Sequence, residues 1–372
     1  MAPVKQKRLN NGDSFDTKKE RKKWKEQKLL KAAGFKKGVD HVTNSEDVVS
    51  SPPTCSSVAK ASENFESTHT ISIAVPGSIL SNAQTAELRA YVAGQIARAA
   101  CIYRVSEVIV FDDVGSQNNN AIRKPGEDRC AQFCRLLQYL ECPQYLRKHF
   151  FPLHKDLQYA GIMNPLDAPH HLRQSDDFPF REGVVSHHLL KQGKGSFVNV
   201  GLIRDVGVDR ALVPDIRVTV KLLPQKEGTK KRFGVIVPPT QPTEELGVYW
   251  GYKVRFAPSL SDVFTKAPYE EGYDLTIGTS DKGKPIEECE DSEFIDFKHM
   301  LLVFGGLAGL EAALECDENL DIDDVTLLFD KYLNTCPDQG SRTIRTEEAV
   351  LISLAEIRRS IKAAKKVVVN DK

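Results

Sequence analysis

Short apolar runs separated by polar turns recur along the chain from residue 70 onward. The β-branched runs at 71–75 and 107–111 predict strands, and residues 85–100 between them carry apolar side chains at helical spacing. A strand, a helix and a strand in this order predict a right-handed βαβ unit in a parallel sheet. Apolar runs at 273–277, 300–304 and 327–333 continue the α/β pattern. A helix capped by Thr346 is expected over 347–364, with Val350, Leu354, Ile357 and Ile361 as its buried stripe.

Residues 181–256 follow a different pattern, with five short β-rich runs and little helical periodicity. The runs are 183–185, 196–202, 217–223, 232–237 and 248–256. Strict alternation places Val218, Val220 and Leu222 on one face of the third run. Five short strands in succession are typical of a small closed barrel such as an OB-fold. Because α/β signals resume afterwards, we expect the barrel to be inserted into the α/β domain.

The first 67 residues are predicted to form a disordered basic tail. Residues 1–37 hold 13 Lys and Arg against four acids, while the whole chain has no net charge. This basic arm on an acidic body suggests a polyanionic partner or an address signal. Basic clusters at 5–8 and 18–23 resemble a two-part nuclear import signal, although a solvated tail or a general RNA contact explains them too. The expected units are 1–67 (tail), 68–165 (first α/β part), 166–260 (barrel) and 261–372 (second α/β part).

Several function classes are disfavoured by what the sequence lacks. Its longest apolar run, 300–310, is too short to span a bilayer and is broken by glycines, and the N-terminus has no apolar signal-peptide core. The eight cysteines form no paired C-x2-C knuckles, so no metal site is predicted. Cys130 and Cys134 are expected to be buried core residues. No P-loop is present, and the glycines at 305–309 do not match the dinucleotide pattern.

Three loops rich in glycine and polar residues follow predicted strands, at 278–283, 305–309 and 334–345. Ligands of parallel sheets bind beyond the carboxyl ends of the strands, where such loops gather. A turn at Gly305 and Gly306 would let a ligand approach the backbone. A tight strand-to-helix turn would explain these two glycines equally well. Around the last loop, two Arg and two Glu crowd a helix start, which is more than a helix cap needs.

These segments resemble the SPOUT class of S-adenosylmethionine-dependent RNA methyltransferases. Residues 94–100, 303–311 and 334–354 look like its first, second and third motifs. The nearest resemblance is to the eukaryotic and archaeal branch with an inserted OB-like domain, through 75–80, 140–147, 164–167, 249–252 and 273–279. It covers about residues 68–360. It implies an α/β fold in which a knotted parallel-sheet methyltransferase domain, with a trefoil knot, carries the inserted β-barrel.

The resemblance also implies an activity and a site. The expected cofactor is S-adenosyl-L-methionine, held by Gly278, Thr279, Lys282, Gly305, Gly306, Asn334 and Thr335. The expected reaction is methylation of ring nitrogen 3 of a uridine in large-subunit ribosomal RNA. Arg98 and Arg345 are the catalytic candidates, as stabilisers of the anionic base or anchors of phosphate. Arg98 could instead be a helix-surface charge, and Lys282 a solvated loop lysine.

The resemblance further implies a homodimer with the cofactor site near the subunit interface and Arg98 acting close to or across it. It places the protein in the nucleus or nucleolus, with the cytoplasm and the mitotic spindle or kinetochore as further locations, since the branch's human member is linked to the spindle. A non-catalytic RNA- or spindle-binding protein is the alternative function. No membrane partner is expected.

The predicted barrel gives a separate argument for RNA. Its aromatic and basic side chains alternate, as on surfaces that stack bases and contact phosphates. The RNA-binding candidates are Arg217, Lys221, Tyr249, Trp250, Lys253 and Arg255. Alternation sends some of the aromatic side chains to the barrel interior, so not all of them can form a stacking platform.

Overall fold

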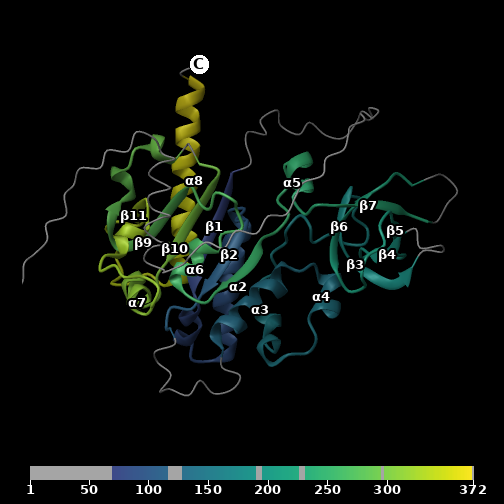
Figure 1. Cartoon of the computed structure of the whole chain (residues 1–372), viewed down its shortest axis with the longest axis horizontal. Coiled ribbons are helices and arrows are strands. Elements are labelled where there is room, and N and C mark those ends of the chain that lie inside the picture. The colour runs from purple at the N-terminus through teal and green to yellow at the C-terminus, as the bar shows by residue number, and fades with distance from the viewer. Residues whose placement is uncertain (1–68, 116–127, 190–194, 226–230, 295–296, 371–372) are drawn as a thin grey trace, which may run out of the picture.

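The computed structural model describes residues 69–115, 128–189, 195–225, 231–294 and 297–370. The predicted tail and its import signal lie outside these residues. Figure 1 shows two parts side by side along the long axis: an α/β part with helix α8 projecting from it, and a smaller barrel. The predicted combination of a parallel-stranded α/β part and a β-barrel is confirmed.

Six of the described strands form one sheet, in the order β11-β9-β10-β1-β2-β8, and every neighbouring pair is parallel. The strands are β1 (Thr70–Pro76), β2 (Glu107–Phe111), β8 (Lys253–Ala257), β9 (Leu275–Pro285), β10 (His299–Phe304) and β11 (Lys331–Asn334). Because all run the same way, their carboxyl ends share one edge of the sheet and their amino ends share the other. The predicted strands at 71–75, 107–111 and 300–304 are thereby confirmed.

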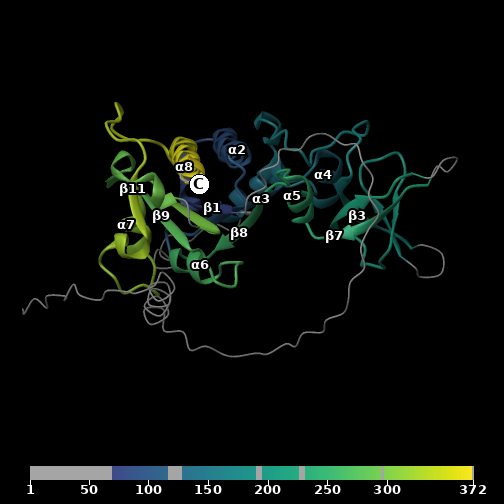
Figure 2. The ribbon, with the colours of Figure 1, turned by 90° about the horizontal axis from the view of Figure 1, so that it is seen from above.

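Helices cover both faces of the sheet, as a parallel sheet requires. In Figure 2, α2 (Ala86–Ile102), α3 (Arg129–Glu141) and α8 (Thr346–Asn370) lie on one side, and α6 (Leu260–Thr265) and α7 (Gly309–Glu315) on the other. Side-chain alternation divides each strand between two cores: Ile73 and Val75 pack under α2, α3 and α8, and Ala74 packs with α6 and α7. Alternating burial on two sides explains why these strands read as continuous apolar runs.

The long helices form where the sequence predicts them, but Thr346 does not cap α8, because it is the first helical residue and its hydroxyl donates to the Gly305 carbonyl. The Thr85 hydroxyl accepts the Leu88 N–H and caps α2, and the predicted stripe of α8 is buried in the first core. Shorter helices are α4 (Gln144–Phe150) and α5 (Gln241–Leu246). Single 3-10 turns are η1 (Gly77–Asn82), η3 (Lys155–Leu157), η4 (Ala160–Ile162), η6 (Ile286–Glu288), η7 (Asp291–Phe294) and η8 (Val325–Leu328). None of the described helices has the length and apolar content needed to cross a membrane.

The barrel is closed by five described strands in the order β3-β4-β5-β7-β6, with β6 pairing back onto β3. They are β3 (Phe180–Leu189), β4 (Ser196–Asn199), β5 (Val206–Val208), β6 (Arg217–Leu222) and β7 (Phe233–Val237). A core built mainly of valines fills it, and Val220, Val218 and Leu222 all contribute to that core from one face of β6, as predicted. Strand number and closure agree with an OB-like barrel.

The expectation that the run 248–256 supplies the fifth barrel strand is wrong. The fifth strand is β5, whose three residues are too few to stand out in the sequence. Residues 253–257 instead form β8, which pairs in parallel with β2 at the edge of the sheet. The β3–β6 pairing closes the barrel and leaves it no open edge, whereas β2 offers unpaired backbone groups that β8 satisfies.

Candidate active site

The three predicted loops converge at the carboxyl edge of the sheet, because β9, β10 and β11 are neighbours there. The side-chain amide of Asn334 donates to the Asp281 carbonyl at 3.1 Å, which joins the third loop to the first. The Thr279 hydroxyl donates to the Val303 carbonyl at 3.1 Å, which joins the first loop to the strand that carries the second. These two contacts bring residues 53 and 24 positions apart into one site.

The second loop is a tight turn at Gly305. A Cβ on this residue would stand 2.8–3.0 Å from backbone atoms of Gly309 and Leu310, so only glycine fits. Gly306 faces another direction, where a Cβ would stand 3.0 Å from Ser78 Oγ and 3.2 Å from Asp113 Oδ2. Of the two explanations for this glycine pair, the tight turn accounts for Gly305. At Gly306, the absence of a side chain lets the polar side chains of Ser78 and Asp113 lie close to the backbone.

The first loop is a bulge inside β9 and not a free turn. Tyr332 pairs with Gly278 while the next residue of β11, Leu333, pairs with Lys284, so residues 279–283 arch out of the β9–β11 ladder, although Thr279 still pairs with Phe304 of β10. Gly278 lies against the rings of Phe329 and Tyr332, which a Cβ would meet at 2.6–2.7 Å. Lys282 projects from the arch, exposed, with Nζ 3.3 Å from Glu311 Oε1. The Glu311 carboxylate raises the pKa of Lys282, so this lysine stays charged.

The third loop leads back from the edge strand β11 to the middle of the sheet. There the Thr346 hydroxyl donates to the Gly305 carbonyl at 3.0 Å, at the start of α8. Glu348 accepts the backbone N–H of Arg345 at 3.0 Å and so caps the helix, and the Thr335 and Ser353 hydroxyls share a buried hydrogen bond of 2.7 Å. The Arg345 side chain is exposed, with Glu347 as its nearest carboxylate at 3.9 Å. Arg345 is therefore beside the cofactor loops with its guanidinium available.

Arg98 is not brought to these loops within the chain. Helix α2 starts at the carboxyl edge and runs back along the sheet for about 25 Å, and Arg98 lies near its far end. Its guanidinium donates to the carbonyls of Leu166 (2.6 Å) and Pro165 (3.3 Å). An arginine in this place can serve a cofactor only on another molecule, so its catalytic role stays a prediction.

Two groups at the site were not predicted from the sequence. Asp113 accepts the backbone N–H of Ser78 at 3.1 Å and also the Ser78 hydroxyl, which holds its carboxylate beside Gly306. Burial raises the pKa of Asp113, and the Ser78 hydrogen bonds oppose that rise. The Tyr332 hydroxyl is buried and has no hydrogen-bond partner among the described residues. Asp113 had a sequence signal, since an Asp pair ends the second predicted strand, but Tyr332 had none beyond its place in an apolar run.

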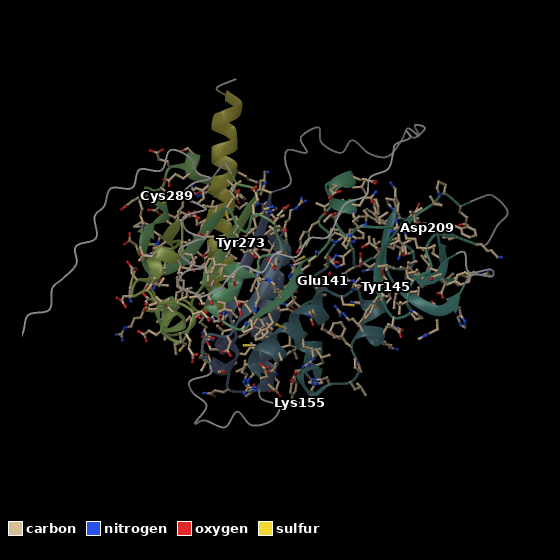
Figure 3. All side chains as sticks on the ribbon, in the orientation of Figure 1. Glu141, Tyr145, Lys155, Asp209, Tyr273 and Cys289 are labelled. Atoms are coloured by element: carbon tan, nitrogen blue, oxygen red, sulfur yellow. The ribbon has the colours of Figure 1, made fainter. Side chains whose placement is uncertain are left out.

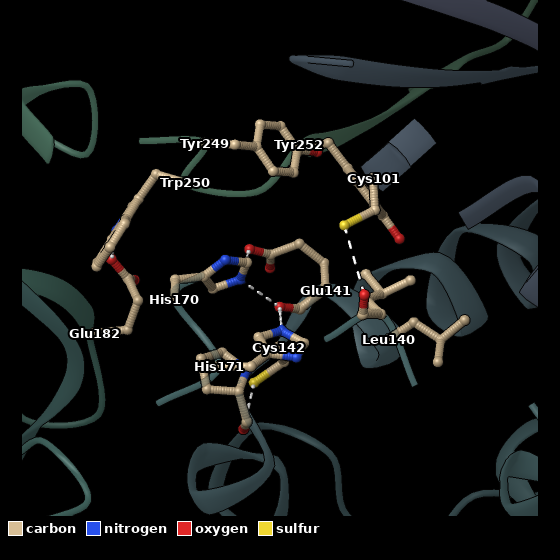
Figure 4. A network of polar contacts seen from close by, with 12 residues as sticks. Cys101, Leu140, Glu141, Cys142, His170, His171, Glu182, Tyr249, Trp250 and Tyr252 are labelled. Atoms are coloured by element: carbon tan, nitrogen blue, oxygen red, sulfur yellow. Dashed lines mark hydrogen bonds and ion pairs between the residues drawn. The ribbon is translucent and has the colours of Figure 1, made fainter. Parts of the chain in front are cut away.

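The RNA-binding candidates of the barrel region mostly have partners inside the protein. Arg217 holds Glu141 through two hydrogen bonds, at 2.6 and 2.9 Å, and Glu182 through a third at 2.7 Å. Burial lowers the pKa of Arg217, but the two carboxylates outweigh this and raise it. Trp250 is 8% exposed and donates to the other Glu182 oxygen at 2.7 Å. Figure 3 shows Glu141 between the sheet and the barrel, and Figure 4 shows it beside His170 and His171, with Trp250 on the far side of His170.

Three of the other four RNA-binding candidates also have partners inside the protein, and one does not. The Tyr249 hydroxyl donates to the Val105 carbonyl at 2.8 Å, and Lys221 binds both Glu245 oxygens at 2.7 and 2.9 Å. Arg255 binds Glu107 at 2.8 Å and two carbonyls of α6. Lys253 is exposed at the start of β8 and forms no ion pair among the described residues. RNA binding stays a prediction for all six, and Lys253 is the candidate whose charge is not already paired.

The residues of the site fit the cofactor that the resemblance implies. An adenosine needs hydrogen-bonding groups around its base and ribose, and here the Tyr332 ring lies against Gly278 with its buried hydroxyl near the Ser280 side chain of the first loop. The charged and exposed Lys282 adds a place for a polar tail. Gly278, Gly305 and Thr335 support the loops through packing and hydrogen bonding. Across the described residues, no group of three or more His, Cys, Asp or Glu is placed to hold a metal ion.

Comparison with known proteins agrees with this site. Residues 70–357 match the family described as "Putative RNA methyltransferase". A Drosophila melanogaster protein named 28S rRNA (uridine-N(3))-methyltransferase is 58% identical over 304 residues, which are 78% of this chain and 62% of that protein. The Homo sapiens and Mus musculus proteins of the same name are 52% and 53% identical over 296 residues. Those matches cover 78% of this chain and 78% and 76% of the relatives. The chain therefore spans less than two thirds of the fly relative but more of the mammalian ones.

Proposed function

Because the chain belongs to the RNA methyltransferase family that its residues 70–357 match, we propose that it methylates ring nitrogen 3 of a uridine in large-subunit ribosomal RNA, with S-adenosyl-L-methionine as donor. The observation that carries this proposal is the convergence of three loops on Gly305, on the sheet edge where α/β proteins bind ligands. The identity above 50% to relatives named for this reaction supports the choice of atom.

The cofactor residues fall into two groups. Gly306, Lys282 and Asn334 present backbone or polar groups to the site, while Gly278, Thr279, Gly305 and Thr335 shape the loops. S-adenosylmethionine, when bound, supplies an electrophilic methyl group on a sulfonium. The task of the protein is to align the acceptor nitrogen with that group and to stabilise the charge that develops.

Nitrogen 3 of neutral uridine carries a proton, which has to leave before or during methyl transfer. Asp113 is the carboxylate next to Gly306, and burial raises its pKa, which makes it a better proton acceptor. Arg345 is exposed at the same edge and can stabilise the anionic ring or hold a neighbouring phosphate. We assign proton acceptance to Asp113 and charge stabilisation to Arg345.

The test is a methylation assay with the purified protein, S-adenosylmethionine and a large-subunit ribosomal RNA transcript. Nucleoside mass spectrometry should detect 3-methyluridine. Methylation of a ribose hydroxyl or of guanine instead would refute the choice of acceptor. Calorimetry that detects no binding at millimolar S-adenosylmethionine would favour the non-catalytic RNA- or spindle-binding alternative.

Finer features of the family resemblance are part of the same proposal. We expect a trefoil knot, supported by the path of residues 335–345 from the edge strand back to Gly305, and a homodimer in which Arg98 serves the partner. Sedimentation should give twice the monomer mass. We also expect nuclear or nucleolar location, with spindle association in mitosis, and loss of nuclear retention when residues 1–37 are removed.

A further inference from the structure

A large cleft lies at the amino edge of the sheet, on the side opposite the candidate active site. Its volume is about 1910 Å³, and it separates the first residues of β1, β8 and β10 from the barrel and α5. The end of α2 and the middle of α8 complete its wall through Tyr103 and Arg358. Pockets for small ligands measure roughly 300–1,000 Å³, so this cleft is suited to a longer occupant.

The acidic side chains that line the cleft are largely paired with cations, of which Arg217 and Arg255 also line the cleft and Lys221 does not. The pairs are Glu107 with Arg255, Glu141 and Glu182 with Arg217, and Glu245 with Lys221. The pairs made by Arg255 and by Lys221 carry no net charge, whereas the two carboxylates on Arg217 leave one negative charge. Of the lining carboxylates, Glu244 on α5 is exposed and has no ion pair among the described residues.

Four further cations line the cleft and are exposed: Arg104, Lys253, Arg358 and Lys362. None of them forms an ion pair within the described part of the chain. They come from the end of α2, the edge strand β8 and helix α8, which are far apart in sequence. The charge left after pairing is therefore positive. Since the cations lie on separate elements around one cleft, they match an extended polyanion better than a single phosphate.

Aromatic rings accompany these cations. The Arg358 guanidinium lies 6.0 Å from the ring centre of Tyr103, and Tyr269 stacks on His299 at 3.7 Å. Tyr103 and Tyr269 are half-buried, so each presents part of its ring to the cleft. Aromatic rings beside cations are the combination that binds single-stranded nucleic acid, through base stacking and phosphate contacts.

We propose that this cleft binds a single strand of the substrate RNA that flanks the target uridine. The proposal rests on the proposed function, because it takes RNA as the substrate. Arg98 lies in the last turns of α2 and Arg104 follows six residues later, just beyond the helix, so RNA in the cleft passes close to the arginine expected to act on another molecule. The cleft thereby guides RNA along the amino edge of the sheet, whereas the cofactor loops lie at the carboxyl edge.

The test measures RNA binding by a variant of the cleft against a matched control. The variant is Lys253→Glu with Arg358→Glu, and the control is Lys148→Glu with Lys266→Glu, two exposed lysines outside the cleft. The probe is a fluorescein-labelled single-stranded RNA of about 20 nucleotides, enough for one or two site lengths. We expect the cleft variant to raise Kd about 10-fold and to lower the slope of log Kd against log salt by about 1.4, for two lost phosphate contacts. The control should stay within about twofold, as expected of distant charges under salt screening.

Calorimetry with S-adenosylmethionine should give the same affinity for both variants, because neither changes a cofactor loop. Equal RNA affinity and salt slope in the cleft variant and the control would overturn the proposal. Labelled polyglutamate that binds the wild type better than RNA, and not the cleft variant, would assign the cleft to an acidic protein segment and overturn it too. If the charge-reversed chain does not fold, Lys253→Gln with Arg358→Gln decides the matter. If the wild-type protein binds RNA in the cleft but does not bind S-adenosylmethionine, the proposed function is refuted and the proposal for the cleft stands.

Discussion

Arg217 and Glu141 form a two-point ion pair that joins strand β6 of the barrel to the end of helix α3 in the α/β part. Glu182 on β3 binds the same guanidinium, and Trp250 and Thr219 donate to its second oxygen. Gly251 fits against this group because its φ of 91° and missing Cβ leave room for Glu141 and His170. The network adds a charged link between the barrel and the α/β part to the apolar contact of Val184 with Cys142 and Leu146.

Replacement of Arg217 should therefore destabilise the fold. Arg217→Met leaves two carboxylates without their cation, and we expect a loss on the order of 3 kcal/mol in the free energy of unfolding. Arg210→Met, at an exposed arginine of the barrel region, should cost less than about 0.5 kcal/mol. Urea denaturation measures both. Weaker RNA binding by Arg217→Met with unchanged stability would restore the RNA role predicted for this residue.

The same network should make stability depend on acid pH. Burial raises the pKa of Glu141, but His170 and Arg217 outweigh it and hold the pKa well below its usual range. A carboxyl with a lowered folded pKa stabilises above its unfolded pKa of about 4.3, and this is lost as pH falls toward the folded value. The urea midpoint should decline below about pH 4.5 in the wild type, and less steeply in Glu141→Gln. Parallel curves for the two proteins would contradict this.

His171 should act in a higher pH window. Burial lowers its pKa from 6.5 to about 4, so the unfolded chain binds a proton that the folded chain excludes between these values. Stability should thus fall as pH drops from 6.5 to 4. His171→Phe removes the group and should flatten this part of the curve. A wild type equally stable at pH 6.5 and 4.5 would show that His171 does not titrate in this way.

Gly305→Ala should damage the cofactor loop. The added Cβ meets backbone atoms at 2.8–3.0 Å, which cannot rotate away, so we expect a cost of about 1–3 kcal/mol. Calorimetry should show cofactor binding weakened at least about 10-fold, a loss near 1.4 kcal/mol. Gly340→Ala is the matched control, because a Cβ there meets nothing within 4 Å. Normal cofactor affinity in Gly305→Ala would separate this turn from the cofactor site.

Asp113 and Arg345 should differ in their kinetic effect. Asp113→Asn keeps the shape beside Gly306 but removes the proton acceptor, so single-turnover methylation should slow about 10²–10⁴-fold and lose its acid limb. Arg345→Ala should slow methylation about 10²–10³-fold without that change in pH profile. Arg342→Ala, at another exposed arginine of the same loop, is the control. An Asp113→Asn enzyme with the wild-type pH profile would remove Asp113 from proton transfer.

The sequence predicted those parts of the fold whose signal is local. Strands β1, β2 and β10 and the buried stripe of α8 each lie within one periodic segment, and all were found. The parallel sheet followed from the order of these elements. The three loops could be predicted to meet because parallel strands end at one edge.

Strand pairs and ion pairs between residues far apart in the sequence could not be predicted from the local pattern of residues. The run at 253–257 alternates as a barrel strand would, and only the closure of the barrel and the open edge of β2 decide its place. The cations Arg217 and Arg255 looked available in sequence, because their carboxylate partners lie 76 and 148 residues away. From the sequence, Asp113 is only one of two aspartates that end a predicted strand, and its place at the site becomes visible when the structure puts it beside Gly306.

Strand β8 has a consequence for how the chain folds as the ribosome makes it. Strands β1 and β2 are synthesised before the whole barrel, and β8 to β11 after it, so both borders of the β1–β2 pair stay unpaired during that interval, including the β2 border that β8 later covers. An unfinished β2 border is a template for unwanted pairing with other chains. Release of a product truncated within the barrel should thus yield aggregates, and not a smaller working enzyme.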